Sequence, residues 1–148
     1  MAVRGSKSHD VLVAHLSRGN ATWVPRASAV LVTATQVAPD EDGNGGGRYT
    51  AYDLGQAAAH VTLQARSMGL DAHQFSGFDQ DAVHADLGVP DHFRVMTGIA
   101  IGVPGDPDDV DERTRERDQR ARHRKPLETI AYGDSWGAPW AARPGGDA

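Results

Sequence analysis

The sequence predicts an α/β or α+β fold in which helices and a central sheet form three layers. Two segments rich in β-branched and small apolar residues, 28–37 and 93–103, are typical of buried strands. Between them, residues 52–70 carry apolar side chains at helical spacing. Because strands and helices alternate along the chain, helices are available to cover the faces of the sheet.

Composition limits the class of protein. The chain has 148 residues, which suits a single domain over residues 1–148. Lys and Arg number 15 against 20 Asp and Glu, for a formal net charge of −5. An acidic balance argues against a nucleic-acid binder, because phosphate neutralisation needs an excess of Lys and Arg. The absence of cysteine excludes disulfides, thiol nucleophiles and cysteine-based zinc sites.

No targeting or membrane segment is recognisable. Residues 1–10 lack the apolar stretch of a secretory signal. The longest apolar runs, 29–32 and 99–103, are far shorter than the roughly 20 residues that span a bilayer. We therefore expect a soluble cytoplasmic protein that binds no membrane.

Turn-forming residues mark the boundaries in the first half. Residues 11–16 are expected to end a helix before a turn at 17–20. Residues 39–48, rich in Gly and acidic residues, predict a polar loop without a phosphate-binding fingerprint.

The long helix is the clearest element. Asp53 lies in its first turn and Gly69 at the place of a left-handed cap. Its predicted apolar face comprises Leu54, Ala57, Ala58, Val61, Leu63, Ala65 and Met68. The three consecutive alanines at 57–59 have small side chains, which permit close approach of another helix, either in the core or in a dimer.

Shorter elements follow. Residues 72–78 predict a strand that ends in a turn at Ser76-Gly77, and residues 79–87 a short helix capped by Asp79 and closed by Gly88. In the strand 93–103, alternating small residues suggest that a helix or ligand approaches one face.

The C-terminal third is more polar. Residues 105–124 predict a solvated helix that starts at 106–109, with acids first and arginines last. Residues 127–132 predict a terminal strand, and residues 141–148 a loose tail. Trp136 and Trp140 need burial, for which a partner subunit is one candidate.

Familiar hydrolytic and metal motifs are missing. The seven histidines show no metal-ligand spacing, and no Gly-x-Ser-x-Gly elbow occurs. We therefore expect no metal site and no catalytic nucleophile.

Two stretches are candidates for ligand binding. In the turn Gln74–Asp79, a glycine leaves backbone N–H groups open to the edge of a flat ligand. An ordinary strand-to-helix turn is the alternative. In Arg122-His123-Arg124-Lys125-Pro126, two alternating guanidiniums suit a phosphate, although the basic end of an exposed helix would look the same.

Five segments, in consistent order, resemble the nitroreductase family of FMN-dependent oxidoreductases. They are Asp53-Leu54-Gly55-Gln56-Ala57, Phe75-Ser76-Gly77-Phe78-Asp79, residues 93–107, Arg122-His123-Arg124-Lys125-Pro126-Leu127 and residues 132–139. Residues around Gly19-Asn20 and Trp23 resemble the segment before an earlier strand of that family.

The resemblance implies a nitroreductase-like α+β sandwich with a mostly antiparallel sheet, and a homodimer that exchanges C-terminal arms. It implies FMN as cofactor, NAD(P)H as co-substrate and a nitroaromatic or quinone-like acceptor. The chemistry takes place on the flavin, so no catalytic side chain is expected. The cofactor-binding residues it implies are Gln74, Phe75, Ser76, Gly77, Arg122, His123 and Arg124.

The resemblance also implies a shortened N-terminal part, without the family's Arg-x-Ser-type motif and Asn-x-Gln-Pro-Trp-like stretch. This keeps a second hypothesis open, a dimeric binding module or remnant without flavin. A third, nucleic-acid binding through residues 113–124, is disfavoured by the interleaved acidic residues.

Overall fold

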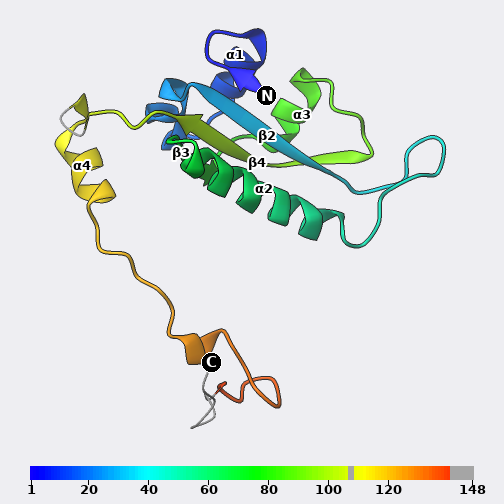
Figure 1. Cartoon of the computed structure of the whole chain (residues 1–148). Coiled ribbons are helices and arrows are strands. Elements are labelled where there is room, and N and C mark those ends of the chain that lie inside the picture. Colours follow the sequence, from blue (N-terminus) through cyan, green and yellow to red (C-terminus); the bar gives the residue numbers. More distant parts are fainter. Residues whose placement is uncertain (107–108, 141–148) are drawn as a thin grey trace. The chain divides into compact units, whose positions relative to one another are not determined.

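The computed structural model describes residues 1–106 and 109–140, in two compact units, Met1–Gly105 and Asp106–Ala148 (Figure 1). Each unit is described by itself. Among the described residues, no helix is long and apolar enough to cross a membrane.

The first unit is built on a four-stranded antiparallel sheet. Its strands are β1 (Ala2–Val3), β2 (Ala29–Gln36), β3 (Asp71–Phe75) and β4 (Phe93–Gly102), in the order β1-β2-β4-β3. The three predicted strands of this unit are confirmed, with each end within three residues of the predicted position. The two-residue strand β1 was not predicted, because so short a segment carries no periodic signal.

A bulge interrupts the central pair. The register between β2 and β4 shifts between Val32 and Ala34. There the Thr97 N–H donates to the Thr33 hydroxyl at 3.0 Å, and this hydroxyl lies 3.0 Å from the Thr97 carbonyl. The threonine side chain thus replaces ladder partners lost at the bulge, which keeps the buried polar groups satisfied.

Helices cover both faces of the sheet, as the α+β prediction requires. The long helix α2 (Thr50–Ser67) runs across one face (Figure 1), where the Gln74 side chain donates to the Thr62 hydroxyl at 2.9 Å. Side chains alternate along a strand, so neighbouring Phe75 points to the opposite face. The core on that face joins the sheet to α1 (Lys7–Ala14) and α3 (Gln80–Asp86).

Helix α2 uses a narrower apolar stripe than the sequence predicts. Ala58 and Ala65 are buried, whereas the side chains of Leu63 and Met68 are 68% and 66% exposed. These two residues of the predicted apolar face therefore lie outside the stripe that packs on the sheet. Leu63 is five positions after Ala58, about 140° around the helix, which takes it out of the stripe.

The ends of the helices follow their capping residues. Gly69 has φ +78°, and the N–H of Leu70 donates to the Ala65 carbonyl at 3.0 Å, which confirms the left-handed cap of α2. Asp79 caps α3 by accepting from the Ala82 N–H at 3.0 Å, also as predicted. Gly88, with φ +63°, follows the end of α3.

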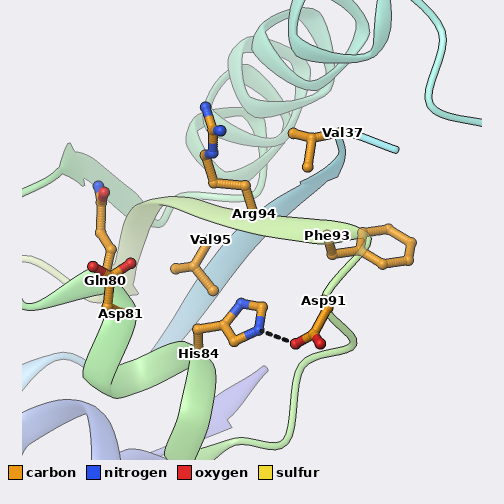
Figure 2. Close-up of a pocket in the computed structure, with 8 residues that line it drawn as sticks. All are labelled: Val37, Gln80, Asp81, His84, Asp91, Phe93, Arg94 and Val95. Carbon is orange, nitrogen blue, oxygen red and sulfur yellow. Dashed lines mark ion pairs between the residues drawn. The ribbon is translucent and has the colours of Figure 1, made fainter. Parts of the chain in front are cut away.

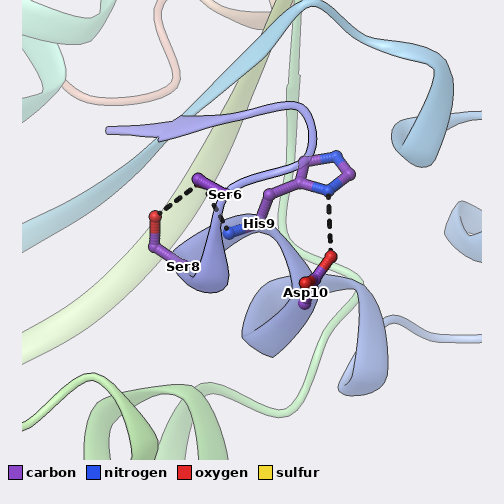
Figure 3. Close-up of polar contacts among 4 residues, drawn as sticks. All are labelled: Ser6, Ser8, His9 and Asp10. Atoms are coloured by element: carbon purple, nitrogen blue, oxygen red, sulfur yellow. Dashed lines mark hydrogen bonds and ion pairs between the residues drawn. The ribbon is translucent and has the colours of Figure 1, made fainter.

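Helix α1 begins with a serine cap. The Ser6 hydroxyl accepts from the backbone N–H of His9 at 3.3 Å and lies 3.1 Å from the Ser8 hydroxyl (Figure 3). The His9 side chain is buried and its Nε2 has no hydrogen-bond partner in the part of the chain that the structure describes.

The second unit departs from the sequence predictions. Helix α4 covers only Glu112–Asp118 and is capped by Asp111, so the helix is shorter than the 105–124 predicted. Residues 107–108, part of its predicted start at 106–109, lie outside the described residues. Like charges at helical spacing, Arg117 with Arg120, disfavour the continuation of α4. Residues 127–132 are not a strand: Leu127–Thr129 form the 3₁₀ turn η4. The predicted tail, 141–148, lies outside the described residues.

A glycine in β4 makes room for the aromatic core. A Cβ built on Gly98 would meet the Phe75 ring at 2.4 Å. We expect Gly98→Ala to lower the free energy of unfolding by about 1–3 kcal/mol, because the ring cannot retreat within a packed core. Gly55→Ala is the matched control: nothing lies within 4 Å of its Cβ, and alanine favours a helix. Equal stabilities of the two variants in urea unfolding would contradict this packing.

Candidate functional site

The turn between β3 and α3 is held by hydrogen bonds to the segment that follows α1. The Gly77 carbonyl accepts hydrogen bonds from the Ser17 N–H at 2.9 Å and from the Asn20 Nδ2 at 3.0 Å. The Asp79 N–H donates to the His15 carbonyl at 2.9 Å. The segment after α1 therefore fixes the position of a turn that is far away in the sequence.

The same turn presents unused backbone donors. The Phe78 N–H is engaged with the Ser76 carbonyl at 3.0 Å. In the described part of the chain, the N–H groups of Ser76 and Gly77 donate to no backbone carbonyl or side chain. Ser76 is exposed and Gly77 half-buried. Two adjacent N–H groups near the surface can receive the polar edge of a ligand.

Glycine is required at position 77 by its surroundings. A Cβ there would lie 2.6 Å from the Asn20 Nδ2 and 2.7 Å from the Ser17 Oγ. A side chain here would force either the Asn20 and Ser17 side chains or the turn itself to shift. The preference for glycine therefore comes from packing within the fold, on the side of the turn that Ser17 and Asn20 occupy.

The two predicted residues before the turn have their side chains engaged within the fold. The Gln74 side chain points to α2, and its Nε2 lies 3.3 Å from the Ala58 carbonyl. Phe75 is 7% exposed, in T-shaped contact with Phe78 at a centroid distance of 5.8 Å. The Phe75 ring and the Gln74 Nε2 are therefore engaged within the fold.

The predicted phosphate-binding residues lie in the second unit. Arg122, His123 and Arg124 are exposed, in a segment without helix or strand. The Arg124 Nη1 donates to the His123 carbonyl at 3.3 Å. Among the described residues, neither arginine forms an ion pair with a carboxylate. Their meeting with the turn at Gly77 stays a prediction.

Sequence reasoning missed three residues that build the turn. Ser17 and Asn20 contact Gly77 directly, and Trp23 donates from its indole Nε1 to the Asn20 Oδ1 at 3.2 Å. The turn signal at Gly19-Asn20 located the segment but carried no information about its distant partner. The long-range pairing is visible only in the folded chain.

A separate cavity of about 410 Å³ lies between α3 and the start of β4 (Figure 2). His84, Asp91 and Phe93 are among its lining residues, and it shares none with the turn at Ser76-Gly77. Figure 2 shows His84 turned toward Asp91, 3.9 Å apart in an ion pair, and Arg94 on the other side of β4. This polar surface differs from the mostly apolar lining of typical cofactor pockets.

Comparison with known proteins assigns the family. The model of the nitroreductase family matches residues 3–103. The chain belongs to the nitroreductase family. The matched range contains the turn at Ser76-Gly77 together with Asn20 and Trp23. Membership of the family places this chain among oxidoreductases.

Individual relatives agree with this assignment. An uncharacterized 15.4 kDa protein in the ask 5′ region of Mycolicibacterium smegmatis is 40% identical over 133 residues, covering 90% of this chain and 87% of that protein. A crystal structure of an oxidoreductase containing FMN has a TM-score of 0.81 and 27% identity, over 93% of this chain and 70% of the other. A nitroreductase family protein from Streptococcus pneumoniae has the same fold, with a TM-score of 0.64 and 17% identity over 90% and 76%.

Proposed function

We propose that this chain is an FMN-dependent oxidoreductase that passes a hydride from NAD(P)H to a nitroaromatic or quinone-like acceptor. The observation that carries the proposal is the rigid turn at Ser76-Gly77, with two unused N–H groups. Family membership and a similar structure that contains FMN support it.

The turn fits the edge of a flavin ring. A planar ring presents carbonyl and nitrogen acceptors at its edge, and backbone N–H groups are suitable donors to them. The N–H groups of Ser76 and Gly77 would hold this edge. Gln74 and Phe75 would act through the backbone, because their side chains fix β3 in the fold.

The phosphate of the cofactor would be held by Arg122 and Arg124. Both are exposed and without a carboxylate partner among the described residues. Guanidinium groups bind phosphate oxygens in a bidentate manner, and such charge-assisted bonds are stronger than neutral ones. His123, between them, would contribute backbone contacts.

Bound FMN supplies hydride and electron transfer between NAD(P)H and the acceptor. The chain's own residues bind and orient the ring through the N–H groups of Ser76 and Gly77. They need no acid, base or nucleophile. The turn does not move easily, because three hydrogen bonds fix the Gly77–Phe78 peptide and its neighbour.

Anaerobic reduction tests the activity. We expect the FMN-loaded protein to lose its visible flavin absorbance on addition of NADH or NADPH, and to regain it when a quinone or a nitroaromatic is added. Free FMN at the same concentration is the control for uncatalysed reduction. A loaded protein that bleaches no faster than free FMN would contradict the proposal and leave a flavin-binding module without this activity.

We further propose that the protein is a cytoplasmic homodimer. The outward face of α2 carries Tyr52 and Leu63, which are 67% and 68% exposed, and in the second unit Trp136 is 91% exposed. Apolar groups of this size favour burial against a partner. We expect sedimentation at twice the mass of 15.8 kDa, and dissociation on Leu63→Arg with the monomer fold intact. A monomer that binds FMN normally would contradict the dimer.

A further inference from the structure

We infer that Trp23 positions the Gly77 turn for the cofactor by fixing the orientation of the Asn20 side chain. The inference rests on the proposed function for its ligand. Its geometry stands on the hydrogen bonds of Trp23 and Asn20 within the chain, which involve no cofactor.

The orientation of the Asn20 amide is determined by its partners. An indole N–H can only donate, so the atom 3.2 Å from the Trp23 Nε1 must be the amide oxygen. A carbonyl can only accept, so the atom 3.0 Å from the Gly77 oxygen must be the amide nitrogen. With Trp23 absent, the Gly77 carbonyl would still favour the amide nitrogen. The Asn20 side chain would then have one anchor instead of two, and it could rotate away from the turn.

Trp23 is itself fixed by aromatic packing. Its ring is in T-shaped contact with His73 at 4.8 Å and with Phe75 at 5.4 Å between centroids. Phe75 in turn contacts Phe78, the residue that follows the turn. The side chain that orients Asn20 is therefore anchored on β3 and cannot easily rotate away.

The Asn20 side chain influences the direction of the Gly77 N–H, one of the two unused donors. The Asn20 Nδ2 and the Ser17 N–H both bind the Gly77 carbonyl, and the Phe78 N–H binds the Ser76 carbonyl. These bonds fix the planes of the two peptides on either side of Gly77. The direction of the free Gly77 N–H follows from those planes, so loss of the Asn20 bond changes the donor that faces the ligand. Trp23 is a positioning residue and does not touch the ligand.

A double-mutant cycle tests this relay, the chain of hydrogen bonds from Trp23 through Asn20 to Gly77. Trp23→Phe keeps an aromatic ring and removes the indole N–H, and Asn20→Ala removes the amide. We expect each to weaken FMN binding by about 3–10-fold, the effect of one hydrogen bond, and the double variant to be no weaker than Asn20→Ala alone. Asn20→Asp should reproduce the loss, because its carboxylate can accept from Trp23 but cannot donate to Gly77.

A nearby variant controls for the loss of any hydrogen bond in this segment. Thr22→Val removes a neighbouring hydrogen bond, from the Thr22 hydroxyl to the Gly19 carbonyl at 2.8 Å, and should leave FMN binding unchanged. If Trp23→Phe has no effect on FMN affinity, or if its effect adds fully to that of Asn20→Ala, the relay is refuted.

A flavin-free measurement distinguishes this inference from the proposed function. Hydrogen exchange of the Phe78 amide reports the turn directly, since this N–H donates to the Ser76 carbonyl. We expect Trp23→Phe and Asn20→Ala to speed its exchange equally in protein without FMN. If the wild type binds no FMN while both variants show this change, the proposed function fails and the positioning role stands. Unchanged exchange in both variants would overturn the positioning role.

Discussion

Replacement of Arg122 and Arg124 by alanine is expected to weaken FMN binding by about 100-fold or more. Each charge-assisted contact to the phosphate contributes about 1.5–3 kcal/mol, and two such contacts are lost together. The fold should survive, because both side chains are exposed and lie in a segment without helix or strand. Titration of the variant with FMN, followed by absorbance, measures the change.

A matched variant controls for net charge. Arg117→Ala with Arg120→Ala removes the same charge from exposed positions at the end of α4. We expect it to bind FMN as the wild type does at physiological salt, where exposed charges at a distance are screened. Equal affinities of the two double variants would remove Arg122 and Arg124 from the site.

Gly77→Ala is expected to abolish tight flavin binding while the rest of the fold persists. The new Cβ would lie 2.6 Å from the Asn20 Nδ2 and 2.7 Å from the Ser17 Oγ. Either these side chains or the turn must shift, and in both cases the hydrogen bond from the Asn20 Nδ2 to the Gly77 carbonyl is disturbed. We expect at least about 10-fold weaker FMN binding from the misplaced donors, with about 1–3 kcal/mol lower stability from the overpacking.

Two nearby alanine variants serve as controls, and they show whether the loss of FMN binding is specific to position 77. Ser76→Ala keeps the backbone N–H and changes only an exposed side chain, so FMN affinity should not change. Gly19→Ala introduces a Cβ that meets nothing within 4 Å. If Ser76→Ala were as harmful as Gly77→Ala, the hydroxyl and not the backbone would carry the contact.

Local signals predicted the elements of the first unit well. The β-branched runs around Val30 and Val95 fold as central strands, because burial of both faces favours such residues. Asp79 and Gly69 marked helix ends because capping depends on the residue itself.

Predictions failed where the outcome depends on tertiary contacts or on competing charges. Leu63 matches a broad helical pattern, yet the sheet contacts only the stripe that contains Ala58 and Ala65. Residues 127–132 alternate like a strand, but Leu127–Thr129 form a 3₁₀ turn and Tyr132 makes only an isolated bridge to Pro139. A strand needs a partner for its backbone groups, and sequence periodicity does not supply one.

The candidate site was predicted in part. The turn at Ser76-Gly77 could be located from the glycine and from the resemblance. Its support by Asn20 could not, because those residues are 57 positions apart and their meeting depends on the packing of α1 and the following turns against the sheet. The joining of Arg122 and Arg124 to this site remains a prediction for the experiments above.

Flavin retention tests the central claim most directly. The purified protein is mixed with FMN, desalted, and its absorbance spectrum recorded. We predict a retained flavin band near about 450 nm, as for any bound oxidised flavin, which is lost in Gly77→Ala and kept in Ser76→Ala. A colourless wild-type protein after desalting, with no binding in an FMN titration, would contradict the account and identify a member of the family that does not use this turn to hold a flavin.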